Sequence, residues 1–295
     1  MKERHKVNWE KAMPFLFILP CVGILLAISI FPLIYSLWLS FNSWELAMGF
    51  PPEFIGVGNY IRLFLEPRFW NAMLNTGRVL LFGVGSQFLI GLAIAILLDR
   101  LIRGRTLITT LFLLPMVIAP VVVGCTWRQI YHYEYGPLNY ILRGVNLSAI
   151  PWLSNPNFSL SSVIIGDTWE WTPFMMVVIL AGLQSIPEEL REAAAIDGAS
   201  NWKIFTHVLL PLLKPVIIVA ILIRVMDAFK LFDLVVLLTQ GGPGESSETI
   251  TYYNYLVGFK HFSLGYAAAL SYIQLVVIVV IANFFLRFLR ERETR

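Results

Sequence analysis

Four charged residues recur at every third position within an otherwise apolar segment of the C-terminal half. They alternate in sign, as Arg224, Asp227, Lys230 and Asp233. An ionisable side chain in a segment apolar enough to enter a bilayer is costly unless it is paired or hydrated, so a functional role is its first interpretation. On a continuous helix, residues three apart lie within side-chain reach. The competing interpretation is a self-neutralising ladder of ion pairs. We favour the ladder for Arg224 and Lys230, and for Asp227 both interpretations stay open at this point.

The elements that position these charges must be membrane spans. The chain has 295 residues, of which 57% are hydrophobic and 14% charged, whereas soluble domains carry about 25% charged residues. This composition excludes an ordinary soluble enzyme, a disordered chain and a nucleic-acid-binding protein. The two cysteines, Cys21 and Cys125, lie in apolar runs without metal-ligand spacing, so we expect neither a disulfide nor a metal site.

Windows of about 20 apolar residues predict six spans, because every backbone group in the hydrocarbon must be satisfied within its own segment. Four windows contain no charge, at 12–44, 79–98, 106–127 and 261–286. The fourth span carries acids in its outer half, and the fifth carries the alternating charges. The expected fold is all-α, a single transmembrane domain over 1–295 with spans at about 14–40, 76–98, 106–128, 163–184, 206–229 and 265–287.

The distribution of Lys and Arg predicts the orientation, since short cytoplasmic loops carry an excess of both. With the N-terminus in the cytoplasm, thirteen of the 22 lie on the cytoplasmic side, against five in the outer loops and four within spans. The thirteen are Lys2, Arg4, Lys6, Lys11, Arg100, Arg103, Arg105, Arg191, Lys203, Arg287, Arg290, Arg292 and Arg295. We therefore expect both termini in the cytoplasm and the first span to be an uncleaved anchor.

The loop between the fourth and fifth expected spans contains a short helix. Pro187 suits a first helical turn, and the acids that follow it complement the positive end of the helix dipole. Gly198 suits a C-terminal cap, and Ser200 or Asn201 can cap the next helix. Small residues in the middle of the helix allow close approach by another surface. The pattern indicates a cytoplasmic helix, at 187–200, that enters a groove in a second protein.

The same loop resembles a known family. The run Glu192-Ala193-Ala194, three residues, Gly198, nine residues, then Val208-Leu209-Leu210-Pro211 matches the EAA motif of the integral membrane subunits of binding-protein-dependent ABC importers. Trp171-Thr172-Pro173-Phe174 and Gly241-Gly242-Pro243-Gly244 look like the carbohydrate-uptake branch, similar to the larger maltose-type permease subunit. The resemblance covers roughly residues 10–290.

The resemblance implies a type I importer permease fold in the cytoplasmic membrane of a bacterium or archaeon. It also implies a second homologous permease, two cytoplasmic ATPases and an extracytoplasmic solute-binding protein that delivers a sugar. The ATPase-coupling residues it implies are Glu188, Glu189, Glu192, Ala193, Ala194, Asp197, Gly198, Leu210 and Pro211. The chain lacks the Gly-Lys dipeptide of a P-loop. We therefore expect no enzyme activity and no cofactor here, with ATP and Mg used by the partner ATPase.

Maltose-type relatives hold the sugar about midway across the membrane. The matching positions here are Asp167, Glu170, Trp171 and Phe174 in the fourth span, Ile223, Met226 and Asp227 in the fifth, and Met116 in the third. Aromatic rings can cover the apolar face of a pyranose, and carboxylates accept hydrogen bonds from its hydroxyls. The acid at 227, where the maltose relative has an amide, indicates a ligand that differs from maltose or is held differently. It also disfavours an anionic sugar phosphate unless Arg224 or Lys230 turns inward.

Two other classes of protein remain alternatives. In an ion-coupled secondary transporter, Asp227 and its neighbours would relay protons or sodium. The single six-span unit and the absence of an inverted repeat argue against this class. A membrane-embedded enzyme would need intramembrane His, Cys or paired Asp, but the four histidines, at 5, 132, 207 and 261, lie near span ends or outside the spans.

Overall fold

The computed structural model describes residues 9–100 and 104–290. This part of the chain is mostly helical, which confirms the expected all-α class, and its strands form one short hairpin. The basic residues expected in the cytoplasm at 2, 4, 6, 103, 292 and 295 lie outside the described residues. Contacts group the chain into two units, and each is described by itself.

The first unit contains the described residues up to Leu65 together with Leu256–Ile273. Its elements are α1 (Trp9–Leu25), η1 (Leu26–Ile30), α2 (Phe31–Ser40), β1 (Asn42–Ser43), η2 (Leu46–Met48), β2 (Glu53–Phe54), α3 (Gly58–Leu65), η5 (Leu256–Lys260) and the start of α15 (Leu264–Arg290). The buried side chain of Asn59 donates hydrogen bonds to the carbonyls of Ser40 and Asn42, each at 2.9 Å. These bonds join α3 to the end of α2 and to the hairpin.

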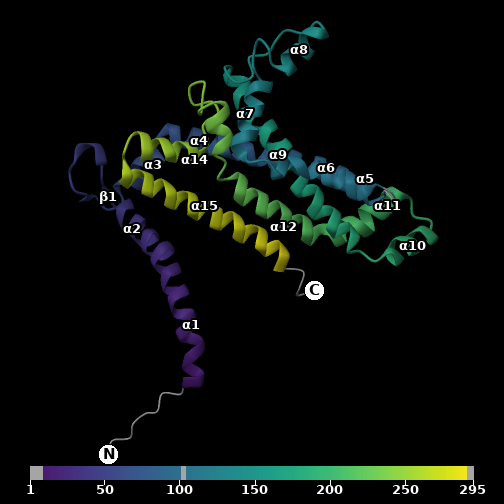
Figure 1. The fold of residues 1–295 in the computed structure, drawn as a ribbon, viewed down its shortest axis with the longest axis horizontal. Coiled ribbons are helices and arrows are strands. Elements are labelled where there is room, and N and C mark those ends of the chain that lie inside the picture. Colours follow the sequence, from purple (N-terminus) through teal and green to yellow (C-terminus); the bar gives the residue numbers. More distant parts are fainter. Residues whose placement is uncertain (1–8, 101–103, 291–295) are drawn as a thin grey trace, which may run out of the picture. The chain divides into compact units, whose positions relative to one another are not determined.

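The second unit contains Glu66–Tyr255 and the described residues from Gln274 onward (Figure 1). Its elements, besides the rest of α15, are α4 (Pro67–Arg78), η3 (Val79–Val84), α5 (Gly85–Asp99), α6 (Arg105–Val117), α7 (Pro120–Ile130), α8 (Pro137–Gly144), α9 (Pro156–Gln184), α10 (Glu188–Ile196), α11 (Asn201–Ile204), η4 (Phe205–Leu209), α12 (Leu210–Ala228), α13 (Asp233–Leu238) and α14 (Ile250–Tyr255).

The helices α5 and α9 pack closely at the centre of the second unit. A Cβ atom on Gly91 would lie 2.7 Å from the Cβ of Met175 and 2.9 Å from the backbone nitrogen of Met176, so only glycine allows this approach. Toward the α10 end, buried apolar residues join α5 and α9 to the segment from α11 to α12; they are Ala95, Leu98, Met176, Ile179, Leu180, Leu183, Ile204, Leu209, Leu213 and Ile217. This core fixes the relative positions of α5, α9 and α12.

The structure has a bent helix pair in place of the continuous span expected at 106–128. The helix α6 ends at Val117, Ile118 and Ala119 are extended, and Pro120 begins α7. The two axes differ by 92°. Proline has no N–H to continue the hydrogen bonds of a preceding helix, and it pushes the residue before it toward extended backbone, so a new helix starts there.

The remaining expected spans overlap long apolar helical segments, at Met13–Ser40, Pro67–Asp99, Pro156–Gln184, Asn201–Ala228 and Leu264–Arg287. Among the described residues, five helical segments are therefore long and apolar enough to cross a membrane, or six if the bent pair counts as one span. The chain is a multi-pass membrane protein.

Candidate functional site

A cluster of charged side chains lies between α5, α9 and α12. Arg224 of α12 is buried, with 1% of its surface exposed. Its Nε donates to Oε1 of Gln87 at 2.9 Å, and its Nη2 donates to both carboxylate oxygens of Asp167, at 3.1 and 2.9 Å. Its Nη1 donates to Oδ2 of Asp227 at 2.5 Å. Removing two charges from water is tolerated only when good geometry and further hydrogen bonds compensate for desolvation, and this guanidinium has both.

Two more contacts complete the cluster. The amide of Gln87 donates to Oδ2 of Asp167 at 2.7 Å, and the guanidinium carbon of Arg224 lies 4.7 Å from the ring centroid of Trp171, a cation–π distance. Arg224 therefore joins three helices and occupies one face of Trp171. The sequence indicates an ion pair with Asp227, but it does not reveal the pairing with Asp167, 57 positions away.

The expected ladder of ion pairs is wrong beyond Arg224 and Asp227. The helix α12 ends at Ala228 and α13 begins at Asp233, so these charges do not share one continuous helix. Within the described chain, no ion pair joins Lys230 to Asp227 or to Asp233.

The break between α12 and α13 is stabilised from a distant segment. The hydroxyl of Thr251 donates to the carbonyl of Phe229 at 3.2 Å, and that of Thr249 donates to the carbonyl of Leu231 at 3.0 Å. The last carbonyls of a helix have no partner within the helix. The two threonines supply donors to carbonyls at the break, which stabilises an interrupted helix.

A polar cavity of about 300 Å³ lies beside this break. Its lining combines α9, the end of α12, the break and the start of α7: Pro120, Asp167, Glu170, Trp171, Asp227, Ala228, Lys230, Leu231, Phe232, Asp233 and Leu234. Four residues expected to contact a ligand thus share one cavity. Lys230 and Phe232 lie in the interruption between α12 and α13, and Pro120 lies at the bend between α6 and α7. Because none of the three is inside a continuous helix there, helical spacing does not predict that they line the cavity.

Four other expected pathway residues lie outside the lining of this cavity. Phe174 is half-buried and packs against an apolar cluster that includes Val84, Met175 and Ala220. Ile223 and Met226 are 48% and 36% exposed on α12. Met116 is half-buried in α6. A ligand role for these four residues stays a prediction.

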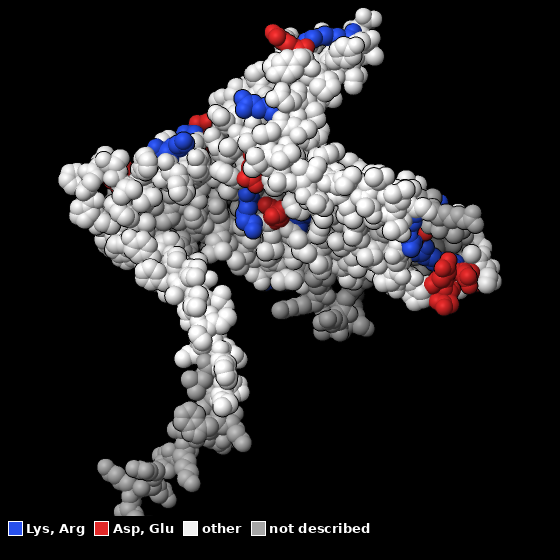
Figure 2. Space-filling model, viewed as in Figure 1, with Lys and Arg blue, Asp and Glu red and all other residues white. Residues whose placement is uncertain are grey.

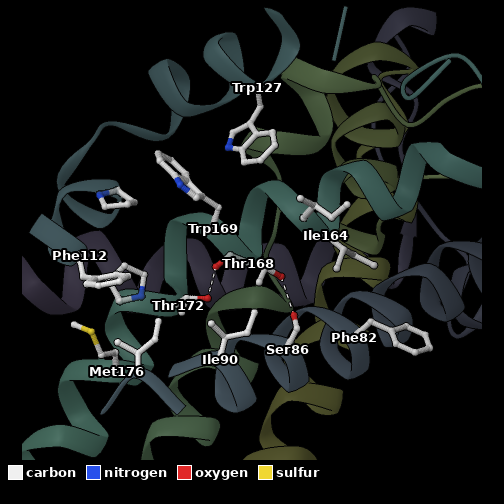
Figure 3. A pocket seen from close by; sticks show the side chains of 14 residues that line it. Phe82, Ser86, Ile90, Phe112, Trp127, Ile164, Thr168, Trp169, Thr172 and Met176 are labelled. Atoms are coloured by element: carbon white, nitrogen blue, oxygen red, sulfur yellow. Dashed lines mark hydrogen bonds between the residues drawn. The ribbon is translucent and has the colours of Figure 1, made fainter. Parts of the chain in front are cut away.

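A second, larger cavity of about 640 Å³ lies among α5, α6, α7 and α9 (Figure 3). Its lining is mainly apolar and aromatic, and its hydroxyls are already paired. Ser86 and Thr168 share a hydrogen bond of 2.9 Å, and the hydroxyl of Thr172 donates to the carbonyl of Thr168 at 2.6 Å. A sugar needs many polar partners, so the smaller, charged cavity is the better candidate for a sugar site.

The short helix expected at 187–200 is α10, and its capping is local. Gly198 has φ of 78°, the left-handed conformation that favours glycine. The backbone nitrogens of Gly198 and Ala199 donate to the carbonyls of Ala195 and Ala194, each at 3.0 Å. Ser200 caps α11, because its hydroxyl accepts from the backbone nitrogen of Lys203 at 3.4 Å.

The surface of α10 is open. The helix has no buried residue, and Asp and Glu gather at this end of the molecule (Figure 2). Of the residues expected to couple to an ATPase, those on α10 and its cap are exposed except for the half-buried Ala194; they are Glu188, Glu189, Glu192, Ala193, Asp197 and Gly198. Leu210 and Pro211 are half-buried at the start of α12. Their placement there indicates packing between α12 and its neighbours.

One helix connects the two candidate regions. The 29 residues of α9 correspond to roughly 43 Å at the rise of an α-helix. Asp167, Glu170 and Trp171 lie near its middle, and three residues separate its end from the start of α10.

No group of three or more potential metal ligands occurs among the described residues.

A multi-pass helical bundle with a charged cavity between its spans and an exposed short helix after the fourth defines a membrane permease. The chain belongs to the family described as "Binding-protein-dependent transport system inner membrane component", whose sequence profile matches residues 80–294. It is 35% identical over 283 residues to the trehalose/maltose transport system permease protein MalF of Thermococcus litoralis, covering 95% of this chain and 94% of the relative. It is also 35% identical to the trehalose transport system permease protein SugA of Mycobacterium tuberculosis, covering 94% of this chain and 89% of the relative.

The fold is also that of a solved permease. A chain of a bacterial ABC transporter involved in the import of the acidic polysaccharide alginate superposes with a TM-score of 0.84 at 24% identity, covering 96% of this chain and 97% of that chain. The expectation of an importer permease with this fold is therefore confirmed, and the ion-coupled alternative finds no support.

Proposed function

We propose that this chain is one of two permease subunits of an ATP-driven importer that carries a sugar across the cytoplasmic membrane of a bacterium or archaeon. The observation that carries the proposal is the presence, on and beside α9, of a charged cavity among the spans and an exposed docking helix beyond their end. The partners would be a second permease, two ATPases and an extracytoplasmic solute-binding protein, and the chain itself would use neither a cofactor nor a metal ion.

In this proposal α10 faces the cytoplasm and docks in a cleft of the ATPase. Its exposed alanines allow close approach, and its acids offer charge partners. The positive-inside bias supports a cytoplasmic location for α10 and for both termini, with 1–295 as one transmembrane domain. ATP and Mg would be bound by the ATPase, and closure of the ATPases would move α10 and with it the spans.

The charged cavity would hold a neutral sugar. Its lining contains the carboxylates of Asp167, Glu170, Asp227 and Asp233, against the single cation Lys230, while buried Arg224 is already paired with two of the acids. Excess carboxylate favours hydroxyl donors and repels a phosphate. Relatives named for trehalose, maltose and lactose transport carry neutral disaccharides, whereas another relative is named for sulfoquinovosyl glycerol, which bears a sulfonate. The preference for a neutral sugar therefore rests on the lining of the cavity and not on the names of the relatives.

The test is reconstitution of the complete complex in proteoliposomes with the binding protein supplied outside. Uptake of labelled trehalose or maltose should require ATP on the ATPase side and should continue when ion gradients are collapsed. Uptake that survives an inactive ATPase but stops with the ion gradient would overturn the proposal. Competition by glucose 6-phosphate as strong as competition by the neutral sugars would contradict the assigned cavity chemistry.

A further inference from the structure

Arg191 differs from the other charged residues of α10 because it contacts the spans. Its Nη1 donates to Oδ2 of Asp99 at 2.6 Å, and Asp99 is the last residue of α5. Its Nη2 donates to the carbonyl of Leu183 at 3.0 Å, in the last turn of α9. One guanidinium therefore links the docking helix to the ends of two spans.

Both partners of Arg191 lie where a cation is favoured. The C-terminal end of a helix has unpaired carbonyls and the negative end of the helix dipole. The side chain of Asp99 is 10% exposed and that of Arg191 is 26% exposed, so solvent screens this pair less than an ion pair on an open surface. The rigid, planar fork of a guanidinium reaches both acceptors at fixed angles, and the compact ammonium of a lysine does not reproduce this geometry.

Little else holds α10 against the spans. The helix has no buried residue, and Ala194 is its side chain that packs, half-buried, against the apolar core. Beside the ion pair lies a cavity of about 410 Å³ whose lining includes Glu192, Asn201 and Phe205. This cavity separates part of α10 from the spans, so close packing does not fix the orientation of the helix there. The contacts of Arg191 therefore contribute much to that orientation.

We propose that Arg191 is a positioning residue that couples displacement of α10 to α5 and α9. The inference rests on the proposed function, because it assigns the path by which an ATPase moves the spans. Arg191 precedes the Glu192-Ala193-Ala194 motif, and the sequence marks it only as a cytoplasmic cation. When α10 is displaced, the guanidinium transmits the movement to Asp99 and to the carbonyl of Leu183. Without the guanidinium, α10 moves but α5 and α9 do not follow its movement.

The experiment measures ATP hydrolysed per sugar imported by the reconstituted complex. Arg191→Ala removes both contacts and should raise this ratio on the order of tenfold, the effect of losing a shielded pair of charge-assisted bonds. Arg191→Lys and Asp99→Asn each keep part of the link and should raise the ratio roughly threefold. The matched control is Arg100→Ala, since Arg100 is exposed beside Asp99 and has no ion pair within the described residues. It should change the ratio by less than about twofold.

A merely structural role predicts a different result. If Arg191 only stabilises the fold, its variants will assemble in smaller amounts while the complexes that form keep a normal ratio, and that outcome would overturn the proposal. Gly198→Val separates the inference from the proposed function. If Gly198→Val uncouples and the Arg191 variants do not, the positioning role is wrong and the docking helix stands. If neither variant has an effect, the docking function of α10 is itself wrong.

Discussion

The charged cavity and the helix α10 are built in opposite ways. Beside the charged cavity, Arg224 is buried, and its Nε, Nη1 and Nη2 donate to Gln87, Asp227 and Asp167 respectively. At the other end of α9, α10 has no buried residue, and its acids, Ala193 and Ala195 are exposed. A buried network has one stable arrangement, whereas an exposed helix needs a partner to complete its surface. Mutation of buried Arg224 should therefore lower stability, and mutation of α10 should change coupling.

The largest expected effect is that of Arg224→Ala. It leaves the carboxylate of Asp167 buried without its cation, which costs about 3–5 kcal/mol. The thermal stability of the detergent-solubilised complex, measured by size-exclusion chromatography after heating, should fall sharply. The double variant Asp167→Asn with Arg224→Gln removes both charges and should recover much of the loss. Unchanged stability of Arg224→Ala would show that the cluster is not a stabilising centre.

Gly198→Val should affect coupling more than stability. Valine at φ of 78° is strained by about 1–2 kcal/mol, and the strain falls on the turn that ends α10. We expect about tenfold weaker binding of the ATPase or a matching loss of ATP-driven uptake, with thermal stability nearly unchanged. Ala195→Ser, also exposed on α10, is a control for substitution without backbone strain. Equal loss in both variants would contradict this explanation.

Asp227→Asn tests whether the contribution of the charged cluster to sugar transport can be separated from its contribution to stability. The side chain of Asp227 is 51% exposed, and Arg224 keeps Asp167 as a partner when the charge at 227 is lost. Sugar uptake should fall several-fold, roughly 1 kcal/mol of transition-state stabilisation, while stability and the affinity of the binding protein for sugar stay constant. Normal uptake would return Asp227 to a purely structural role.

The smallest expected effect is that of Thr249→Val, which removes the hydrogen bond that the hydroxyl donates to the carbonyl of Leu231 and the longer one, of 3.4 Å, that it accepts from the backbone nitrogen of Tyr252. The cost is about 0.5–1.5 kcal/mol, felt at the break that lines the charged cavity. The concentration of sugar-loaded binding protein that half-saturates uptake should rise by about twofold to fivefold. Thr110→Val is a comparison, because its hydroxyl bonds within α6, to Thr106. If Thr110→Val raised the half-saturating concentration as much, the effect of Thr249→Val could not be assigned to the break between α12 and α13.

The sequence predicted the helix α10 well because the determinants of its two ends are local. Proline, acids, glycine and serine within 187–200 define both ends of α10, and the capping bonds connect residues a few positions apart. Five of the six spans were also predictable, since length and hydropathy decide them, whereas the one expected at 106–128 is a bent pair of helices. The motif located the helix but did not reveal that Arg191 ties it to Asp99, 92 positions earlier.

The charged cavity depends on contacts between distant residues. Helical spacing predicted a ladder across 224–233, although the span expected at 206–229 already ends close to Ala228, where α12 stops. The donors that stabilise the break, Thr249 and Thr251, lie about 20 positions further along the chain, and helical spacing does not identify them. The same break brings Lys230 and Phe232 into the cavity. The bend at Pro120 adds a further lining residue from α7, and its direction depends on packing that the sequence alone does not specify.

The pairing of Arg224 with Asp167 also bears on how the protein is made. The ribosome produces α9 before α12, so Asp167 reaches the membrane while its cation is still to be synthesised. A lone carboxylate is poorly tolerated in hydrocarbon, and Gln87 of the earlier span α5 is the neighbour already available to it. The set of partners around Asp167 is thus complete only after α12 has been synthesised.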